Sequence, residues 1–373
     1  MSLNILVINP GSTSDRVSYY RGEDDAFHKT VGYSPVDLAP YESKLATAQS
    51  EMRREFVLKT LREENVELRE IDAVVGRGGL LKPVEGGTYI VNEAMLKDLR
   101  AGVSGDHPAS LGGIIAWGIA NPLGKPAYIA DPPVVDEMEP LARYSGMVDN
   151  PRISLFHALN HKQVGRLAAK ELGKPYQECN LIIMHGGGGI SVGAHCKGRV
   201  VDVNNALDGE GPFTPQRSGS VPVGRLAVMC FSREYSNLQI KLMIKGHGGL
   251  VAHTGTSDLK LLERFITGED ISEEERKMLL PDLTPGKALE AIEAMCYQIG
   301  KEICGLTAVF PGPPDAIVLT GGITYNERIL KLLRDRLEWL ATILVFPGGD
   351  EMFALKEAAR RVLMGEEEAK IYV

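Results

Sequence analysis

The chain has 373 residues, of which 44% are hydrophobic, and this predicts a large core divided between two domains. The net charge of −8 argues against the basic face of a nucleic-acid-binding protein, and no apolar run reaches the roughly 20 residues that span a bilayer, so neither nucleic acid nor a membrane is an expected partner. The five cysteines are scattered without CxxC or metal-ligand spacing, which predicts reduced core thiols in a cytoplasmic protein.

Segments of two kinds alternate along the chain. Short apolar runs typical of buried strands occur at residues 4–9, 73–75, 88–91, 127–129, 180–184, 199–204, 316–319 and 342–346. Segments with helical periodicity lie between them, at residues 42–64, 159–172, 285–309, 325–340 and 353–363. Strands that alternate with helices predict an α/β protein with parallel or mixed sheets.

Two of these strands begin similar stretches of sequence. Residues 4–11, NILVINPG, align without a gap on residues 180–187, NLIIMHGG, so that Asn9 pairs with His185. Each stretch ends in a glycine-containing turn and then continues as a second extended segment. This repeat of strand, turn and strand predicts two duplicated domains, each opened by one copy.

Both turns contain residue types that bind phosphate through the backbone. Glycine lets backbone amides approach a ligand closely, and successive N–H groups on a turn form a concave anion site. We therefore expect the two turns to bind a polyphosphate, with small hydroxyls as further donors. The residues concerned are Gly11, Ser12, Ser14, Gly187, Gly188 and Gly189. The alternative for the four glycines at 186–189 is a tight hairpin that only packing requires.

A third glycine turn follows the strand predicted at residues 316–319. Gly321 and Gly322 end this strand, and a helix begins near Asn326. Open α/β sheets bind ligands at the carboxyl ends of strands, so we expect these residues to contact the adenosine part of a nucleotide. Neither GxxxxGK[ST] nor GxGxxG after a strand occurs, which argues against a P-loop and against a dinucleotide-binding fold.

The order of the three turns resembles that of a known superfamily. INPGSTS, HGGGGIS and LTGGI are similar to the two phosphate loops and the adenosine loop of the sugar kinase, actin and heat-shock chaperone ATPases. Within it, the chain resembles the acetokinase family over nearly its whole length. VINPGSTSDR and FTPQRSGSVP are similar to that family's two signatures. GRGG, at residues 76–79, and GHGGLVAHTGTSD, at residues 246–258, are typical of its branch that acts on butyrate.

The resemblance implies a fold and a reaction. The expected fold has two actin-like ATPase domains, each a mixed five-stranded sheet flanked by helices, with the nucleotide in a central cleft. The first domain would span residues 1–152 and 353–373, and the second residues 153–352. The implied reaction is reversible in-line phosphoryl transfer, with Mg²⁺, from ATP to butyrate or a branched acid such as isobutyrate. Alternatives are an acetate or propionate kinase, or a non-metabolic actin-like ATPase. The resemblance also implies a homo-oligomer, a dimer or larger.

Two arginines match the active-site arginines of the family. Arg77 follows a predicted strand and precedes two glycines, whereas Arg217 lies in a loop rich in proline, serine and glycine. Because the attacking carboxylate and the nucleotide are both anions, the reaction needs positive charge at the site. We assign Arg77 to the substrate carboxylate and Arg217 to the transferring phosphoryl group.

Two carboxylates match the acidic pair of the family. Asp131 comes just after a predicted strand, and Glu351 stands at the start of the last predicted helix. Mg²⁺ binds few protein carboxylates and completes its shell with water and phosphate oxygens, so we assign both residues to the metal. Asp131 can instead orient the substrate. For Glu351 the alternative is helix capping, and the neighbouring Asp350 competes for the metal role.

Histidines complete the candidate site. His157, in LFHALNH, matches the family histidine that donates a hydrogen bond to the transferred phosphoryl group, although ALN stands where the family has GTS. We expect His185 to donate toward a phosphate and Asn9 to play the matching role in the first turn, whereas a satisfied core histidine is the alternative for His185. Arg16 stands where the family has lysine, and its role stays open.

Overall fold

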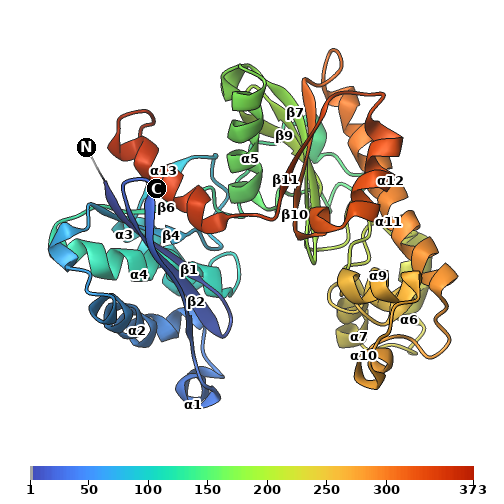
Figure 1. The fold of residues 1–373 in the computed structure, drawn as a ribbon, viewed down its shortest axis with the longest axis horizontal. Coiled ribbons are helices and arrows are strands. Elements are labelled where there is room, and N and C mark those ends of the chain that lie inside the picture. Colours follow the sequence, from blue (N-terminus) through green and yellow to red (C-terminus); the bar gives the residue numbers. More distant parts are fainter. Residues whose placement is uncertain (1–2) are drawn as a thin grey trace. The chain divides into compact units, whose positions relative to one another are not determined.

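The computed structural model describes residues 3–373, and this part of the chain divides into two compact units. The first unit comprises the chain as far as Asp136, Ala158–Asn160 and Asp350–Val373, and the second comprises Glu137–His157 and His161–Gly349. Each unit has one β-sheet with helices packed on it (Figure 1). The α/β fold predicted from the sequence is therefore confirmed. The chain first passes from one unit to the other after Asp136, whereas the domain boundary predicted from the sequence was residue 152.

The first unit is built on a seven-stranded mixed sheet with the order β12-β5-β6-β4-β1-β2-β3. Its strands are β1 (Asn4–Pro10), β2 (Ser14–Arg21), β3 (Asp24–Gly32), β4 (Ala73–Arg77), β5 (Thr88–Ile90), β6 (Ala127–Ala130) and β12 (Lys370–Ile371). β1, β2 and β3 form an antiparallel series, whereas β4 is parallel to both β1 and β6. β5 is antiparallel to β6 and parallel to β12.

The second unit contains a five-stranded mixed sheet with the order β11-β10-β7-β8-β9. Its strands are β7 (Asn180–Gly186), β8 (Ile190–Cys196), β9 (Arg199–Val203), β10 (Ala316–Gly321) and β11 (Ile343–Pro347). β7, β8 and β9 are antiparallel neighbours, and β10 is parallel to β7 and to β11. Five strands were predicted for this sheet, and five are present.

The two sheets share one topology, which explains the repeat seen in the sequence. The series β3-β2-β1-β4-β6 and β9-β8-β7-β10-β11 have the same order and the same parallel and antiparallel neighbours. The first sheet has seven strands rather than the predicted five because β5 and β12 extend it beyond β6. The duplicated part of each unit is therefore a five-stranded sheet.

The helices predicted from periodicity are all present in the described residues, and further helices accompany them. The α-helices are α1 (Pro35–Leu38), α2 (Ser50–Glu63), α3 (Glu93–Ala101), α4 (Leu111–Ala120), α5 (Ala158–Glu171), α6 (Val223–Phe231), α7 (Asn237–Ile244), α8 (Leu250–Thr254), α9 (Leu259–Thr267), α10 (Glu273–Lys277), α11 (Pro285–Leu306), α12 (Glu327–Leu337) and α13 (Glu351–Leu363). Within residues 3–373, no helix combines the length and the apolar character that crossing a membrane requires.

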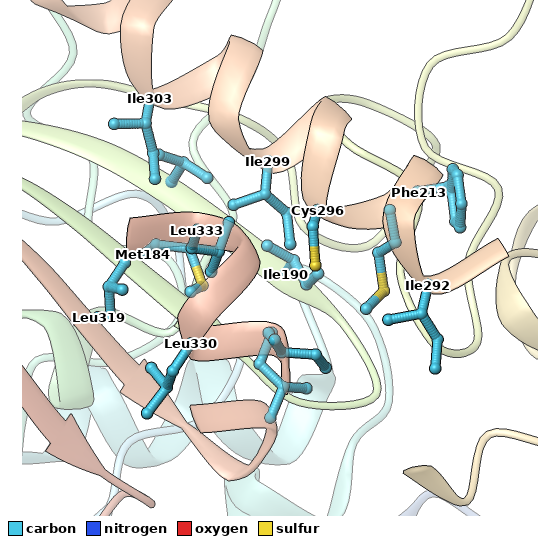
Figure 2. Close-up of a cluster of buried hydrophobic side chains, with 14 of the residues drawn as sticks. Met184, Ile190, Phe213, Ile292, Cys296, Ile299, Ile303, Leu319, Leu330 and Leu333 are labelled. Atoms are coloured by element: carbon cyan, nitrogen blue, oxygen red, sulfur yellow. The ribbon is translucent and has the colours of Figure 1, made fainter. Parts of the chain in front are cut away.

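In each unit, alternate residues of the central strands point to opposite faces of the sheet, and each face packs on helices. In the first unit, Ile5 and Val7 of β1 share an apolar cluster with Leu355 and Ala358 of α13. In the second, the equivalent face of β7 packs on α5. The other face of the second sheet supports α11 and α12, and Figure 2 shows their side chains meeting those of the strands.

Helix α4 approaches β4 more closely than side chains would permit. Gly76 of β4 lies against Gly112 of α4, and a Cβ on either glycine would overlap backbone atoms opposite it. For Gly112 these atoms belong to Arg77, the last residue of β4. α4 contains three glycines, a residue type that disfavours helices, but Gly112 provides the space that packing on β4 needs.

We expect Gly112→Ala to destabilise the protein by about 1–3 kcal/mol, because the added methyl group overlaps the backbone of Arg77. Urea denaturation followed by circular dichroism measures the change. The matched control is Gly118→Ala in the same helix, where the methyl group would meet only the flexible Arg54 side chain, 3.1 Å away. Because alanine is the better helix former, this control should be at least as stable as the wild type. Equal stability of the two variants would contradict the packing argument.

Candidate active site

Four side chains of the first unit meet at the carboxyl ends of β1 and β4. Glu351, the first residue of α13, accepts a hydrogen bond from Asn9 Nδ2 at 2.7 Å. Its carboxylate also forms ion pairs with Arg77, with Nη1 and Oε1 3.0 Å apart, and with Arg16. Asn9 pairs with Arg16 across β1 and β2, so the hairpin itself brings the two together. The structure therefore gathers three residues that the sequence singled out, together with Arg16.

This cluster carries a net positive charge, because two guanidinium groups share one carboxylate. The Arg77 and Arg16 side chains are 29% and 42% exposed, so both also reach solvent. An anion that approached the cluster would meet an excess of positive charge beside preorganised donors. Asp350, the competing candidate, instead caps α13 by accepting a hydrogen bond from the Phe353 amide at 2.9 Å.

Asp131 is held at the end of β6, next to Arg77. Its Oδ1 accepts a hydrogen bond from the Gly87 amide at 2.7 Å, and its own amide donates to the Gly87 carbonyl at 3.0 Å. The residue is buried and has φ of +37°, a value that is unfavourable for aspartate. Such strain persists where surrounding contacts enforce it, and it is concentrated at functional sites.

The first glycine turn closes on itself and leaves its outer amides available. The Gly11 amide donates to the Ser14 carbonyl at 2.7 Å, so the turn is closed before any ligand arrives. Within residues 3–373, the amides of Ser12 and Thr13 donate to no protein acceptor. A phosphate would therefore bind the Ser12 and Thr13 amides, whereas the Gly11 amide holds the turn in shape.

A buried arginine supports this turn from behind. Arg53 of α2 is fully buried, and its Nη1 and Nη2 donate to the carbonyls of Gly11 and Ser12 at 2.7 and 2.9 Å. Nη1 also pairs with Asp15, a buried carboxylate that accepts a hydrogen bond from Tyr33 at 2.7 Å. Arg53 binds the carbonyl side of the turn. No sequence signal distinguished Arg53, because it stands in a helix with many charges.

The second glycine turn has a similar design. The Gly187 amide donates to the Gly189 carbonyl at 2.8 Å, and in the described chain the amides of Gly188 and Gly189 donate to no protein acceptor. Thr214 Oγ1 donates to the Gly188 carbonyl at 2.6 Å and accepts the Arg217 amide at 2.9 Å. Thr214 thus joins the turn to the loop that carries Arg217.

Arg217 lies directly over the second turn. A Cβ at Gly189 would overlap its guanidinium group, whose Nη1 donates to the Ala206 carbonyl. Burial lowers the pKa of Arg217, with Asp208 opposing the effect, but a guanidinium group remains protonated at neutral pH. A larger residue at position 189 would therefore displace the guanidinium group of Arg217 from the turn.

His157 and His185 lie beside the same turn. Their rings stack with centroids 4.1 Å apart, and His157 Nδ1 forms a hydrogen bond with Ser191 Oγ at 2.9 Å. Ser191 follows the turn by two residues and pairs with His185 across β7 and β8. The structure therefore brings together both histidines that the sequence selected, and it adds Ser191, which no sequence signal distinguished from other strand residues.

The third glycine turn lies beside the end of β7. Gly321 has φ of +89°, and a Cβ there would overlap the backbone of Gly186. At Gly322, in contrast, a Cβ would enter open space. Asn326 caps α12 by accepting a hydrogen bond from the Ile329 amide at 3.0 Å. The side-chain oxygen of Asn326 therefore has a structural partner already, whereas Gly322 borders space.

The donor chemistry suits a magnesium ion that the protein binds through few ligands. Within residues 3–373, His, Cys, Asp and Glu side chains form no group of three or more that could hold a metal. Asp131 and Glu351 supply carboxylate oxygens, which Mg²⁺ prefers, and phosphate oxygens and water usually complete its shell. The residues therefore fit a metal that is bound together with a nucleotide.

Comparison with known proteins agrees with this geometry. A family model described as the acetokinase family matches residues 152–373. The chain is also 51% identical over 373 residues to the curated "Probable butyrate kinase" of Elusimicrobium minutum (strain Pei191), with 100% of both chains covered. The chain belongs to the acetokinase family. The family membership that the sequence motifs indicated is thus confirmed, and it identifies the protein as a phosphotransferase with a carboxyl group as the acceptor.

Solved structures share the fold of this protein. The acetate kinase of Porphyromonas gingivalis has a TM-score of 0.77 and 19% identity, with 97% of this chain and 100% of that chain covered. The acetate kinase of Entamoeba histolytica has a TM-score of 0.72 and 16% identity, with coverage of 96% and 99%. For a propionate kinase of Francisella tularensis the TM-score is 0.69 at 20% identity, with coverage of 95% and 98%. These likenesses support the predicted actin-like ATPase fold.

We expect Arg53→Met to destabilise the protein by about 3–5 kcal/mol at neutral pH, because Asp15 would stay buried without its partner. Burial raises the pKa of Asp15, and Arg53 opposes this rise. In the variant, the folded state should therefore bind a proton at Asp15 more tightly than the unfolded state, so stability should recover as the pH falls.

Urea denaturation of Arg53→Met at several pH values measures both effects. The control is Arg54→Met, which removes the neighbouring arginine and its partly exposed ion pairs with Glu51 and Glu55. Such pairs contribute about 0–1 kcal/mol each, so this variant should lose little stability at any pH. A loss for Arg53→Met that did not depend on pH would contradict the role assigned to Asp15.

Proposed function

We propose that the protein transfers the γ-phosphoryl group of ATP to butyrate or a closely related short-chain acid, which yields ADP and an acyl phosphate. The observation that carries this proposal is the full-length 51% identity to a protein named "Probable butyrate kinase". The site geometry supports it, because each unit presents donors and arginines that suit anionic reactants.

The first unit would hold the carboxylate. Arg77 ends β4 beside Arg16, and the carboxylate of Glu351 holds both guanidinium groups in place. A planar guanidinium binds a carboxylate through two parallel hydrogen bonds, which fixes its orientation as well as its position. The positive excess of this cluster would reduce the repulsion between the acid and the nucleotide.

The second unit would hold the phosphates. The amides of Gly188 and Gly189 are available to phosphate oxygens, and Arg217 lies over the same turn. Phosphoryl transfer requires positioning and stabilisation of negative charge more than covalent help. Arg217 would stabilise the transferring group, and His157 would donate a hydrogen bond to it. Gly321 and Gly322 would contact the adenosine.

Asp131 and Glu351 would hold Mg²⁺ with the phosphate oxygens. Such an ion, when bound, neutralises phosphate charge and orients the phosphoryl group. ATP as the donor suits a cytoplasmic enzyme, and the five cysteines are free, as in a reducing compartment. A homo-oligomer remains a prediction from the resemblance to the family.

Replacing either active-site arginine tests the proposal. We expect Arg77→Ala and Arg217→Ala each to lower the rate of acyl phosphate formation by about 10³-fold or more, because each removes positive charge from the transition state. A hydroxamate assay measures the product, and titration calorimetry should show that ATP still binds. Arg62→Ala, which removes an exposed arginine of α2, is the control and should keep its rate. Near-normal rates in both active-site variants would overturn the assignment.

The same assay with acids of two to five carbons distinguishes the candidate functions. We expect kcat/KM to rise from acetate to butyrate or isobutyrate, because burial of each additional CH₂ group contributes about 0.8 kcal/mol, and to fall with acids of five carbons, which exceed a pocket that fits four. Highest activity with acetate or propionate would favour the alternative specificity. ATP hydrolysis without acyl phosphate from any acid would instead favour an actin-like ATPase.

The role of Asp131 can be tested through the magnesium dependence. We expect Asp131→Asn to raise the Mg²⁺ concentration that gives half-maximal activity by about tenfold, because a neutral amide binds the ion less strongly than a carboxylate. Asp136→Asn, five residues further along the chain, is the control. A loss of kcat with unchanged Mg²⁺ dependence would assign Asp131 to substrate orientation instead.

A further inference from the structure

A continuous series of hydrogen bonds runs through the second unit from Tyr176 to His157. The Tyr176 hydroxyl lies 2.6 Å from His195 Nδ1, and His195 Nε2 lies 3.2 Å from His161 Nδ1. His161 Nε2 is 2.8 Å from Ser191 Oγ, which is 2.9 Å from His157 Nδ1. We call these five residues the histidine relay. Only His157 among them belongs to the site predicted from the sequence.

Secondary structure holds the relay in register. Ser191 and His195 are four residues apart on β8, so their side chains point to the same face of the sheet. His157 and His161 are four residues apart at the N-terminus of α5 and lie on one side of that helix. α5 packs on this sheet, and the side chains of Ser191, His161 and His195 are fully buried.

The buried histidines of the relay are neutral. Burial lowers the pKa of both His161 and His195 well below the ordinary value, and the positive charge of Lys162 adds to the effect at each. A neutral imidazole has one N–H group and one nitrogen lone pair. Each of these two rings must therefore donate on one side and accept on the other, so the hydrogen bonds between Tyr176 and Ser191 all run in one direction.

The chemistry of Tyr176 favours one of the two directions. A phenol O–H is a stronger donor than an imidazole N–H, and an imidazole nitrogen is a stronger acceptor than a phenol oxygen. The Arg166 guanidinium lies over the Tyr176 ring, 5.6 Å from its centroid, and this positive charge makes the phenol a still better donor. The Tyr176 hydroxyl therefore donates to His195 Nδ1.

We propose that Tyr176, acting through His195, His161 and Ser191, fixes His157 in the tautomer that carries its proton on Nε2. His195 Nε2–H donates to His161, His161 Nε2–H donates to Ser191, and the Ser191 hydroxyl donates to His157 Nδ1. Nδ1 of His157 then accepts, so its proton is on Nε2.

This tautomer matters for the proposed function, on which its catalytic meaning rests. His157 can stabilise a transferring phosphoryl group only if it presents an N–H donor to it. The relay supplies that donor through hydroxyl and imidazole groups alone. Tyr176, His195 and His161 are thus positioning residues, because they act on the reaction through His157.

Nitrogen NMR of the wild-type protein tests the tautomer directly. With ¹⁵N-labelled histidine, long-range ¹H–¹⁵N spectra distinguish a protonated from an unprotonated ring nitrogen, and His157→Asn identifies the His157 signals among those of the eight histidines. We expect His157 to be protonated at Nε2 and unprotonated at Nδ1 without any substrate. A proton on Nδ1 would overturn the proposal, and this holds whether or not the protein phosphorylates butyrate.

A double-mutant cycle tests the origin of the tautomer. We expect Tyr176→Phe to populate the Nδ1–H form of His157 and to lower kcat by about two- to tenfold, with little change in the KM for ATP, because part of the population loses the donor toward the phosphoryl group. Once Ser191→Ala has cut the relay, Tyr176→Phe should have no further effect on the His157 signals or on kcat.

Tyr19→Phe, which removes a buried phenolic hydroxyl in β2, is the control and should leave His157 unchanged. Additive effects of Tyr176→Phe and Ser191→Ala would show a merely structural role and would overturn the proposal. If Tyr176→Phe does not fold, the spectra of the wild type and of Ser191→Ala still show whether the relay determines the tautomer of His157. Absence of kinase activity in the wild type would refute the proposed function but leave the NMR result valid.

Discussion

The candidate site residues of each unit depend on one constraint, which is the parallel pairing of β1 with β4 in the first unit and of β7 with β10 in the second. Parallel strands end at the same edge of a sheet, so each pairing places a glycine turn beside the end of a second strand. In the first unit that second strand ends in Arg77, and in the second unit it ends in Gly321. One topology thus gives two sites with different chemistry.

The two glycine turns have similar backbone hydrogen bonds, but different side chains support them. Each turn is closed by a bond from its glycine amide to a carbonyl further along, which leaves the next two amides available. The first is held by the buried arginine of α2 and the second by the hydroxyl of Thr214. Asn9 and His185 occupy the same position in the two copies, but one binds a carboxylate whereas the other stacks on a ring.

Local patterns in the sequence were enough to predict most strands, the longer helices and the glycine turns, because each depends on neighbouring residues, whereas β3 and β12 were not predicted. The relay and the support of the first turn were not predictable, because their partners lie far apart in the sequence and no spacing links them. Helix α4 was missed for a related reason, since Gly112 packs on a strand more than thirty residues away. Asp350 and Glu351 could not be distinguished until the helix start was known.

The chain returns to the first unit with its last residues, Asp350–Val373, and α13 covers one face of the first sheet. During synthesis, residues 350–363 must therefore leave the ribosome before α13 can cover this apolar face of the first sheet. The second unit is complete at Gly349, so it can fold before the last residues of the first unit have been synthesised. One apolar face of the first sheet can therefore be covered only after the residues of the second unit have been synthesised.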